Sequence, residues 1–119
     1  GHTFGHAFEA TNRFSKSLNH GEAVLLGMII ACQFAFEKKI LPISDFVKIK
    51  KHFLDLNLPI NLKKHFEKKN VRNIIKFMRI DKKNYNSKIN LILISKIGKC
   101  LPARNFSEKE IAQFLNKKF

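Results

Sequence analysis

The sequence predicts a mainly α-helical domain, a helical bundle with one short strand or hairpin. Apolar residues recur at three- and four-residue steps through most of the 119 residues, which is the period of a helix with one buried face. One stretch, residues 89–95, is instead rich in branched apolar side chains, as strands are. With 45% hydrophobic and 27% charged residues, the chain fits one soluble domain around a single core.

Two helices are expected at the beginning of the chain, over residues 3–14 and 21–39, with a polar loop at residues 13–19 between them. The second is apolar on most faces, so we expect a core helix buried on most sides. Gly27 and Gln33 interrupt its apolar run, which stays below the ~20 residues of a membrane span, so no membrane partner is expected.

Three more helices are expected before the strand. Pro42 ends the long helix, and Ser44 is a suitable N-cap for the next helix, residues 45–56. After an extended link, the pattern predicts short helices at residues 62–69 and 71–79.

The last third of the chain combines a loop, the strand and a terminal helix. A polar loop is expected at residues 81–88, and the strand at 89–95 ends near Gly98. Ser107 and Glu110, three residues apart, form a capping box that begins the terminal helix.

The net charge of +14 comes from lysines spread along the whole chain. A nucleic-acid-binding domain would gather them in a stripe with interleaved aromatic residues or carry a known motif, and neither is found. We therefore expect no nucleic-acid partner. The lysines fit a solvated surface, or alternatively a field that attracts a small anionic substrate.

The two cysteines, Cys32 and Cys100, are too few and too far apart for a disulfide framework. Cys32 falls on the apolar stripe of the long helix, where a buried thiol is expected. No signal-peptide pattern is found at the first residues, so we expect a cytoplasmic protein. Because the chain begins at Gly1 inside a histidine-rich motif and without Met, we also expect a fragment of a longer protein.

Three of the five histidines, His2, His6 and His20, lie in the first twenty residues. On a helix His2 and His6 share one face, close enough to bind one metal ion or one substrate. His20 comes just before the long helix, where its ring could face the first one. A catalytic zinc has three protein ligands, but capping or surface histidines remain the alternative from the spacing alone.

Glycines make a binding site the better interpretation. Four of the five glycines lie in the first 27 residues, and three of them flank the histidines. A helical glycine costs up to about 1 kcal/mol relative to alanine, so this cluster indicates close approach of the backbone to a ligand or a second helix.

Two ordered blocks then identify a family. Residues 1–9, GHTFGHAFE, and residues 20–28, HGEAVLLGM, resemble the GHTxGHAxE and HGEAVxxGM motifs of 3-dehydroquinate synthases. Residues 78–83 and the strand at 89–95 also resemble that family. The resemblance implies that the chain is the C-terminal helical domain, residues 1–119, of a two-domain α/β + α enzyme whose N-terminal NAD-binding domain is absent here.

The resemblance implies roles for individual residues. His2 and His20 match two ligands of a divalent metal, zinc or cobalt, whose third ligand is a glutamate outside this sequence. His6 matches a histidine that contacts substrate and transfers a proton. Lys82 or Lys83, with a slight preference for Lys83, matches a lysine that binds the anionic sugar-phosphate substrate.

The same resemblance implies the reaction of the whole enzyme. It converts 3-deoxy-D-arabino-heptulosonate 7-phosphate to 3-dehydroquinate and phosphate in the shikimate pathway of aromatic amino acid biosynthesis, with NAD and a divalent metal as cofactors. We expect the chain alone to be inactive and the enzyme to be a homodimer.

Other residues near the motifs receive structural interpretations. A place at the start of the long helix suits Glu22 better than metal ligation, because a carboxylate is favourable there. Glu9 is expected to be a structural partner. His52 and His65 lie among lysines and are expected to be solvated.

Three alternatives are considered for the function. Another sugar-phosphate cyclase, such as a 2-deoxy-scyllo-inosose synthase, shares the fold and the metal. Iron-type alcohol or glycerol dehydrogenases lack the GHTxGH block. A non-catalytic basic helical module with a structural zinc would need four ligands, usually with cysteine, and Cys32 lies about three helical turns from His20.

Overall fold

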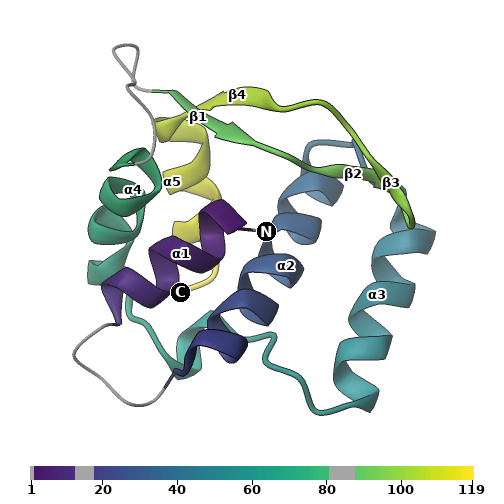
Figure 1. Cartoon of the computed structure of the whole chain (residues 1–119), viewed down its shortest axis with the longest axis horizontal. Helices are drawn as coiled ribbons and strands as arrows, with labels where there is room; N and C mark the ends of the chain where they lie inside the picture. The colour runs from purple at the N-terminus through teal and green to yellow at the C-terminus, as the bar shows by residue number, and fades with distance from the viewer. Residues whose placement is uncertain (1, 13–17, 81–87) are drawn as a thin grey trace.

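Five α-helices and four short strands make up the described part of the chain, residues 2–12, 18–80 and 88–119, in a computed structural model. The predicted mainly α-helical class is confirmed. The helices are α1 (His2–Thr11), α2 (His20–Glu37), α3 (Ile43–Asp55), α4 (Val71–Ile80) and α5 (Glu108–Asn116). Figure 1 shows α2 in the middle of the molecule, with α1, α4 and α5 on one side and α3 on the other.

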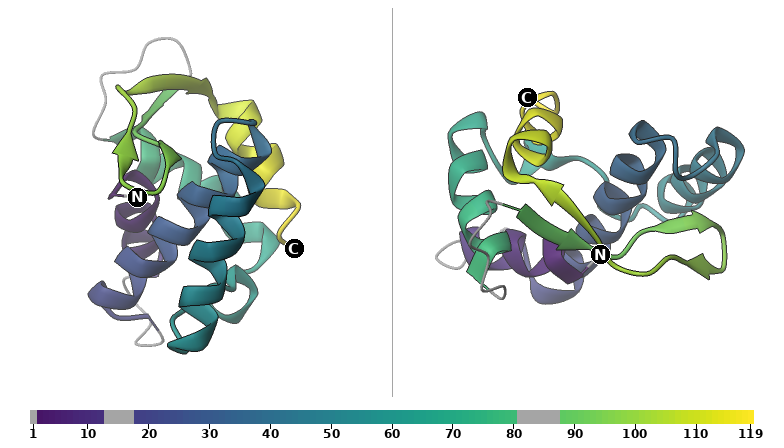
Figure 2. Two further views of the ribbon diagram at one scale, coloured as in Figure 1. Left: turned by 90° about the vertical axis from the view of Figure 1, so that its right-hand side faces the viewer. Right: turned by 90° about the horizontal axis from the view of Figure 1, so that it is seen from above.

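The strands form two separate antiparallel pairs. β1 (Lys88–Leu91) pairs with β4 (Arg104–Ser107), and β2 (Ile94–Lys96) pairs with β3 (Lys99–Cys100). Figures 1 and 2 show these strands extending along one end of the helices, from α5 to α3.

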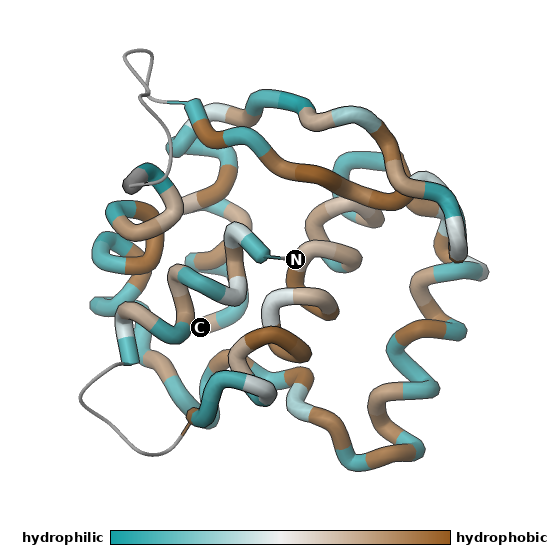
Figure 3. Tube along the Cα trace, in the orientation of Figure 1, coloured by the Kyte–Doolittle hydropathy of each residue, from teal (hydrophilic) through white to brown (hydrophobic). Residues whose placement is uncertain are grey.

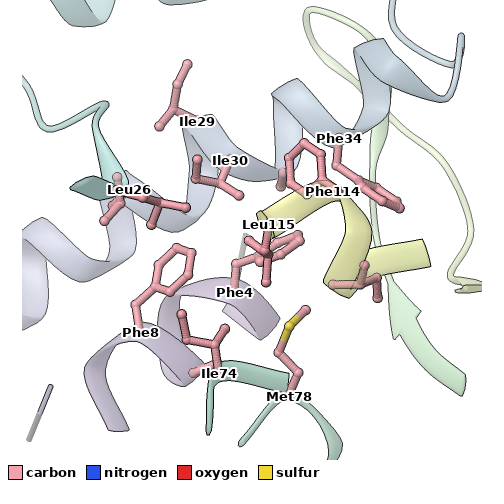
Figure 4. Packing of buried hydrophobic residues seen from close by; sticks show 14 of the residues in the cluster. Phe4, Phe8, Leu26, Ile29, Ile30, Phe34, Ile74, Met78, Phe114 and Leu115 are labelled. Carbon is pink, nitrogen blue, oxygen red and sulfur yellow. The ribbon is translucent and has the colours of Figure 1, made fainter. Parts of the chain in front are cut away.

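The core lies between α1, α2, α4 and α5, and aromatic rings fill its centre. The ring of Phe34 on α2 lies 5.0 Å from that of Phe114 and 5.0 Å from that of Phe106, measured between centroids. Phe4 of α1 contacts the rings of Phe34 and Phe114, and its side chain is fully buried. Figure 4 shows the rings of Phe4, Phe34 and Phe114 together with aliphatic side chains of α2, α4 and α5. Phenylalanines therefore supply much of the core.

The position of α2 in the core follows from its composition. Eight of its 18 residues are buried, including Leu26, Ile30 and Phe34. By length and apolar composition it is also the one described helix that could span a membrane, a test that the core helix of a soluble protein passes equally well. Its burial against α1 and α5 is the role that the sequence predicts for it.

Helix α3 is held to the rest of the molecule by few contacts. Phe46 on α3 stacks on Phe36 of α2 with a centroid distance of 5.1 Å, and the backbone N–H of Ile97 donates to Asp45 Oδ2 at 3.1 Å. Apolar and hydrophilic residues alternate along α3 in Figure 3, and Val47 and Leu54 remain half exposed. One face of α3 is thus not covered by the described residues.

Three details differ from the prediction. Residues 62–69 form two 3₁₀ turns, η1 (Leu62–Lys64) and η2 (Lys68–Asn70), rather than one helix. Local hydrogen bonds cause the break, because Asn61 Oδ1 accepts from Lys63 N and Asn70 Oδ1 accepts from Glu67 N.

The other two differences concern a strand and a cap. The predicted strand at residues 89–95 is divided after Leu91 into two strands. The first part belongs to β1 and pairs with β4, and the second belongs to β2 and pairs with β3. Pro42, not Ser44, is the N-cap of α3, and it makes no side-chain capping bond. The predicted loops at 13–19 and 81–88 lie largely outside the described residues.

Candidate metal and catalytic site

The backbones of α1 and α2 touch at Gly5. A Cβ atom at this position would lie 3.3 Å from the carbonyl oxygen of Ala23 and 3.4 Å from Cα of Val24. The distance to the carbonyl oxygen is tighter than most Cβ contacts, so a side chain at residue 5 would push the two backbones apart by a few tenths of an ångström. The interpretation of the glycine cluster as a close helix approach is confirmed at this position.

His2 and His6 lie side by side on the exposed face of α1. Their ring centroids are 5.3 Å apart and the rings meet edge to face. Both residues are solvent-exposed, while Phe4 and Phe8 on the opposite face of the helix are buried. The shared face predicted for the two histidines is therefore present.

His2 also borders an apolar pocket of about 360 Å³ between α1, α2 and the strands. Met28 and Cys32 of α2 and Ile92 of the β1–β2 connection line this pocket with it. Burial raises the pKa of the Cys32 thiol, so this sulfur is a poor nucleophile and a poor metal ligand. Cys32 is half buried, whereas a buried thiol was predicted.

His20 is the first residue of α2, and a capping box fixes its place. Asn19 is the N-cap: its Oδ1 accepts from Glu22 N at 2.8 Å, and its N–H donates to Glu22 Oε1 at 3.1 Å. The carboxylate of Glu22 is thereby used at the helix N-terminus, as predicted.

The ring of His20 turns back toward α1 and contacts Glu9. Nδ1 of His20 lies 2.9 Å from Oε2 of Glu9, and the side chain of His20 is 69% exposed. Glu9 follows His6 by three residues, so it continues the face of α1 that carries His2 and His6. The structure thus places a carboxylate and three imidazoles along the start of α2 and the exposed face of α1.

The donor chemistry of this face suits a divalent metal. Imidazole nitrogen is a common zinc ligand, and a second hydrogen bond to a carboxylate is typical of ligating histidines. Within residues 2–12, 18–80 and 88–119, however, no three His, Cys, Asp or Glu side chains converge on one point. A catalytic metal bound here would need a ligand from outside the described residues.

The remaining candidate residues fall into three groups. Lys82 and Lys83 lie outside the described residues. His52 is exposed, as predicted. His65 was expected to be solvated, but it is half buried. Its Nδ1 is buried without a hydrogen-bond partner among the described residues.

One feature was missed by sequence reasoning. A basic groove of about 680 Å³ lies between α4 and α5, with Arg72, Arg79 and Lys109 among its lining residues. Glu108 pairs with Arg79 at 2.6 Å and neutralises part of its charge. The signal was present in the sequence only as lysine and arginine residues distributed over two separate segments.

Comparison with known proteins places the chain in one family. Residues 1–84 match the family model described as 3-dehydroquinate synthase C-terminal. The chain is 51% identical over 117 residues to the 3-dehydroquinate synthase of Pelagibacter ubique, covering 98% of this chain and 32% of the relative. The corresponding enzyme of Zymomonas mobilis is 36% identical over 116 residues, covering 98% and 31%. The chain therefore spans about a third of the length of the curated relatives that it matches.

Solved structures show the same fold. A 2-deoxy-scyllo-inosose synthase complexed with carbaglucose-6-phosphate, NAD⁺ and Co²⁺ superposes with a TM-score of 0.70 at 25% identity, covering 98% of this chain and 32% of that one. A second structure of a 2-deoxy-scyllo-inosose synthase gives a TM-score of 0.68 at 23% identity, covering 98% and 30%.

Proposed function

This chain belongs to the 3-dehydroquinate synthase family, and we propose that it is the metal- and substrate-binding C-terminal domain, residues 1–119, of such an enzyme. The whole enzyme would convert 3-deoxy-D-arabino-heptulosonate 7-phosphate to 3-dehydroquinate and phosphate. The observation that carries this proposal is the arrangement of the two motif blocks. The rings of His2 and His6 lie together on the exposed face of α1, and His20 at the start of α2 contacts Glu9 of α1.

In this proposal His2 and His20 hold one divalent cation. Both are exposed imidazoles, and Nδ1 of His20 is engaged by Glu9, which leaves Nε2 for a metal. The third ligand would be a glutamate from the part of the enzyme outside this chain. The Co²⁺ in the related cyclase structure supports a divalent ion, and we propose zinc or cobalt.

His6 is the proposed proton-transfer residue. A bound metal would lower the pKa of a substrate hydroxyl and so prepare it for oxidation by NAD. The ring of His6 lies beside that of His2, so it can accept a proton from a group bound at the metal and return it later. Imidazole suits this task because it exchanges protons near neutral pH.

Lys82 and Lys83 are proposed to bind the anionic groups of the substrate, with Lys83 preferred. Ammonium groups on flexible stems are suited to phosphate and carboxylate as point charges. The overall charge of +14 would also attract such a substrate to the protein.

The rest of the enzyme is proposed to carry the NAD site. The relatives are about three times as long as this chain, and the related cyclase structure contains NAD⁺. An N-terminal NAD-binding domain would complete the active site between the two domains, and this chain alone would be inactive. We further propose a cytoplasmic homodimer.

A second candidate is a 2-deoxy-scyllo-inosose synthase, which the structural likeness favours. An assay of the full-length enzyme with NAD⁺ and Zn²⁺ separates the two. Release of phosphate from 3-deoxy-D-arabino-heptulosonate 7-phosphate, and none from glucose 6-phosphate, supports the first function. Turnover of glucose 6-phosphate alone supports the second. Turnover of neither substrate by an enzyme that holds metal and NAD⁺ rejects both.

A further inference from the structure

The hydrogen bond between Glu9 and His20 joins two motif blocks that are separate in the sequence. Glu9 ends the first block and His20 begins the second, eleven positions later, and the carboxylate and ring nitrogen lie 2.9 Å apart. Among the described residues, Glu9 is the carboxylate in contact with His20. The nearby Glu22 is already engaged in the capping box with Asn19.

Two backbone features set the distance between Glu9 and His20. The contact of Gly5 with Ala23 and Val24 holds α1 close against the first turns of α2. At the other side, Asn19 has an extended backbone with φ −81° and ψ 173°, and its capping box fixes the first turn of α2. The pair is thus built by the packing of the two helices rather than by a chance contact of long side chains.

The hydrogen bond determines which ring nitrogen of His20 carries the proton. An ionised carboxylate only accepts hydrogen bonds, so Nδ1 must be the donor. In the neutral ring Nε2 then carries the lone pair, which is the form that binds a metal ion. Because 69% of the His20 side chain is exposed, the ring remains accessible to a ligand.

The pair contributes little to the stability of the fold. Glu9 is 42% exposed, and such solvent-exposed side-chain pairs contribute little to the free energy of folding. Its geometry is instead that of the carboxylate–histidine pairs that orient metal ligands.

We propose that Glu9 is a positioning residue, which holds His20 in the Nδ1–H tautomer and directs its Nε2 toward the metal. This inference rests on the proposed metal role of His20. Glu9 does not touch the metal or the substrate in this account, and it acts through His20 alone.

The test uses the full-length enzyme, freed of metal with a chelator and titrated with Co²⁺ against a chromophoric competitor. We expect Glu9→Ala to weaken Co²⁺ binding by about 10- to 100-fold, the range for residues that orient a metal ligand. Glu9→Gln keeps a hydrogen-bond acceptor without its charge, so it should give an intermediate loss. The visible absorption bands of Co²⁺ should shift in Glu9→Ala because the ligand ring is no longer held.

Two further variants distinguish the possible outcomes. His20→Ala removes the proposed ligand, and Asp55→Ala removes another exposed carboxylate that pairs with Lys51 on α3. Asp55→Ala should bind Co²⁺ as the unmodified enzyme does. If Glu9→Ala and Glu9→Gln bind normally while His20→Ala does not, the positioning role is wrong and the metal role of His20 stands. If His20→Ala also binds normally, both are wrong.

Thermal melting of the metal-free variants separates positioning from folding. Glu9→Ala should melt close to the unmodified protein, because the exposed pair contributes little to folding. If Glu9→Ala does not fold, Glu9→Gln decides the question, and normal Co²⁺ affinity in that variant contradicts the proposal.

Discussion

Gly5 faces the carbonyl oxygen of Ala23 so closely that a Cβ atom on residue 5 would lie 3.3 Å from it. This contact brings the histidine-bearing face of α1 next to the first residue of α2. The positions of Glu9 and His20 relative to each other depend on it, since both lie within a few residues of the contact.

Gly5→Ala should therefore destabilise the domain and disturb the site. Overpacking costs about 1–3 kcal/mol, and the better helix propensity of alanine offsets up to about 1 kcal/mol of this. We expect faster amide hydrogen exchange in α1 and α2, measured by mass spectrometry on the full-length enzyme. Gly21→Ala is the matched control, because its Cβ would meet only Asn19 Oδ1 at an ordinary 3.5 Å. Equal exchange in the two variants would contradict the role given to the Gly5 contact.

Phe34→Ala should remove the centre of the aromatic core. The side chain of Phe34 is fully buried among Phe4, Phe106 and Phe114, and truncation of such a residue costs about 3–5 kcal/mol. Urea unfolding followed by circular dichroism should show this loss. Leu54→Ala, at a position that is 52% exposed, should change the unfolding free energy much less. A small effect for Phe34→Ala would mean that the core is centred elsewhere.

The contact between Lys38 and Glu110 predicts a pH dependence of stability. The hydrogen bond from Lys38 is the largest cause that lowers the pKa of Glu110 below its ordinary value of 4.5, and a backbone hydrogen bond at Ser107 adds to it. A lowered carboxyl pKa stabilises the fold above that ordinary value, and the contribution is lost as the pH falls through the folded pKa.

Glu110→Gln tests this dependence, because glutamine retains the capping box with Ser107 but not the charge. The pair is partly exposed, so the variant should lose about 0.2–1 kcal/mol at pH 7. This difference from the unmodified chain should shrink as the pH falls below the ordinary carboxyl value of 4.5 and through the lowered pKa of Glu110, in urea unfolding at each pH. A difference that is constant with pH would contradict the assignment.

Lys83→Met should raise KM for the sugar phosphate more than it lowers kcat. A hydrogen bond to a charged group contributes about 1.5–3 kcal/mol, which corresponds to roughly a 10- to 150-fold change. Steady-state kinetics of the full-length enzyme, with Lys82→Met alongside, should show which lysine binds the substrate. Lys48→Met on α3 is the control for loss of one surface charge. If both variants at residues 82 and 83 behave as this control does, neither lysine binds the substrate.

Patterns between residues close together in the sequence were sufficient to predict helices and the residues on one helix face. The apolar run of α2 and the capping box of Ser107 and Glu110 were sufficient to place two helices within one or two residues. The spacing of His2 and His6 was sufficient to place their rings on one face.

Contacts between distant segments were not predictable in the same way. β1 pairs with β4 across a connection that contains the other two strands, and no local pattern encodes that register. Glu9 was expected to have a structural role, but its partner depends on how α1 and α2 cross. The break at residues 62–69 depends on the side-chain amides of Asn61 and Asn70, which compete with the helix backbone.

The central claim is that His2 and His20 bind one metal ion while His6 remains free of it for proton transfer. Anomalous X-ray diffraction at the cobalt edge, on crystals of the full-length enzyme with Co²⁺, tests it most directly. The account predicts one strong peak in contact with ring nitrogens of His2 and His20, with His6 outside ligand distance and Glu9 on Nδ1 of His20. A peak bound to His6, or one that touches neither His2 nor His20, would contradict it.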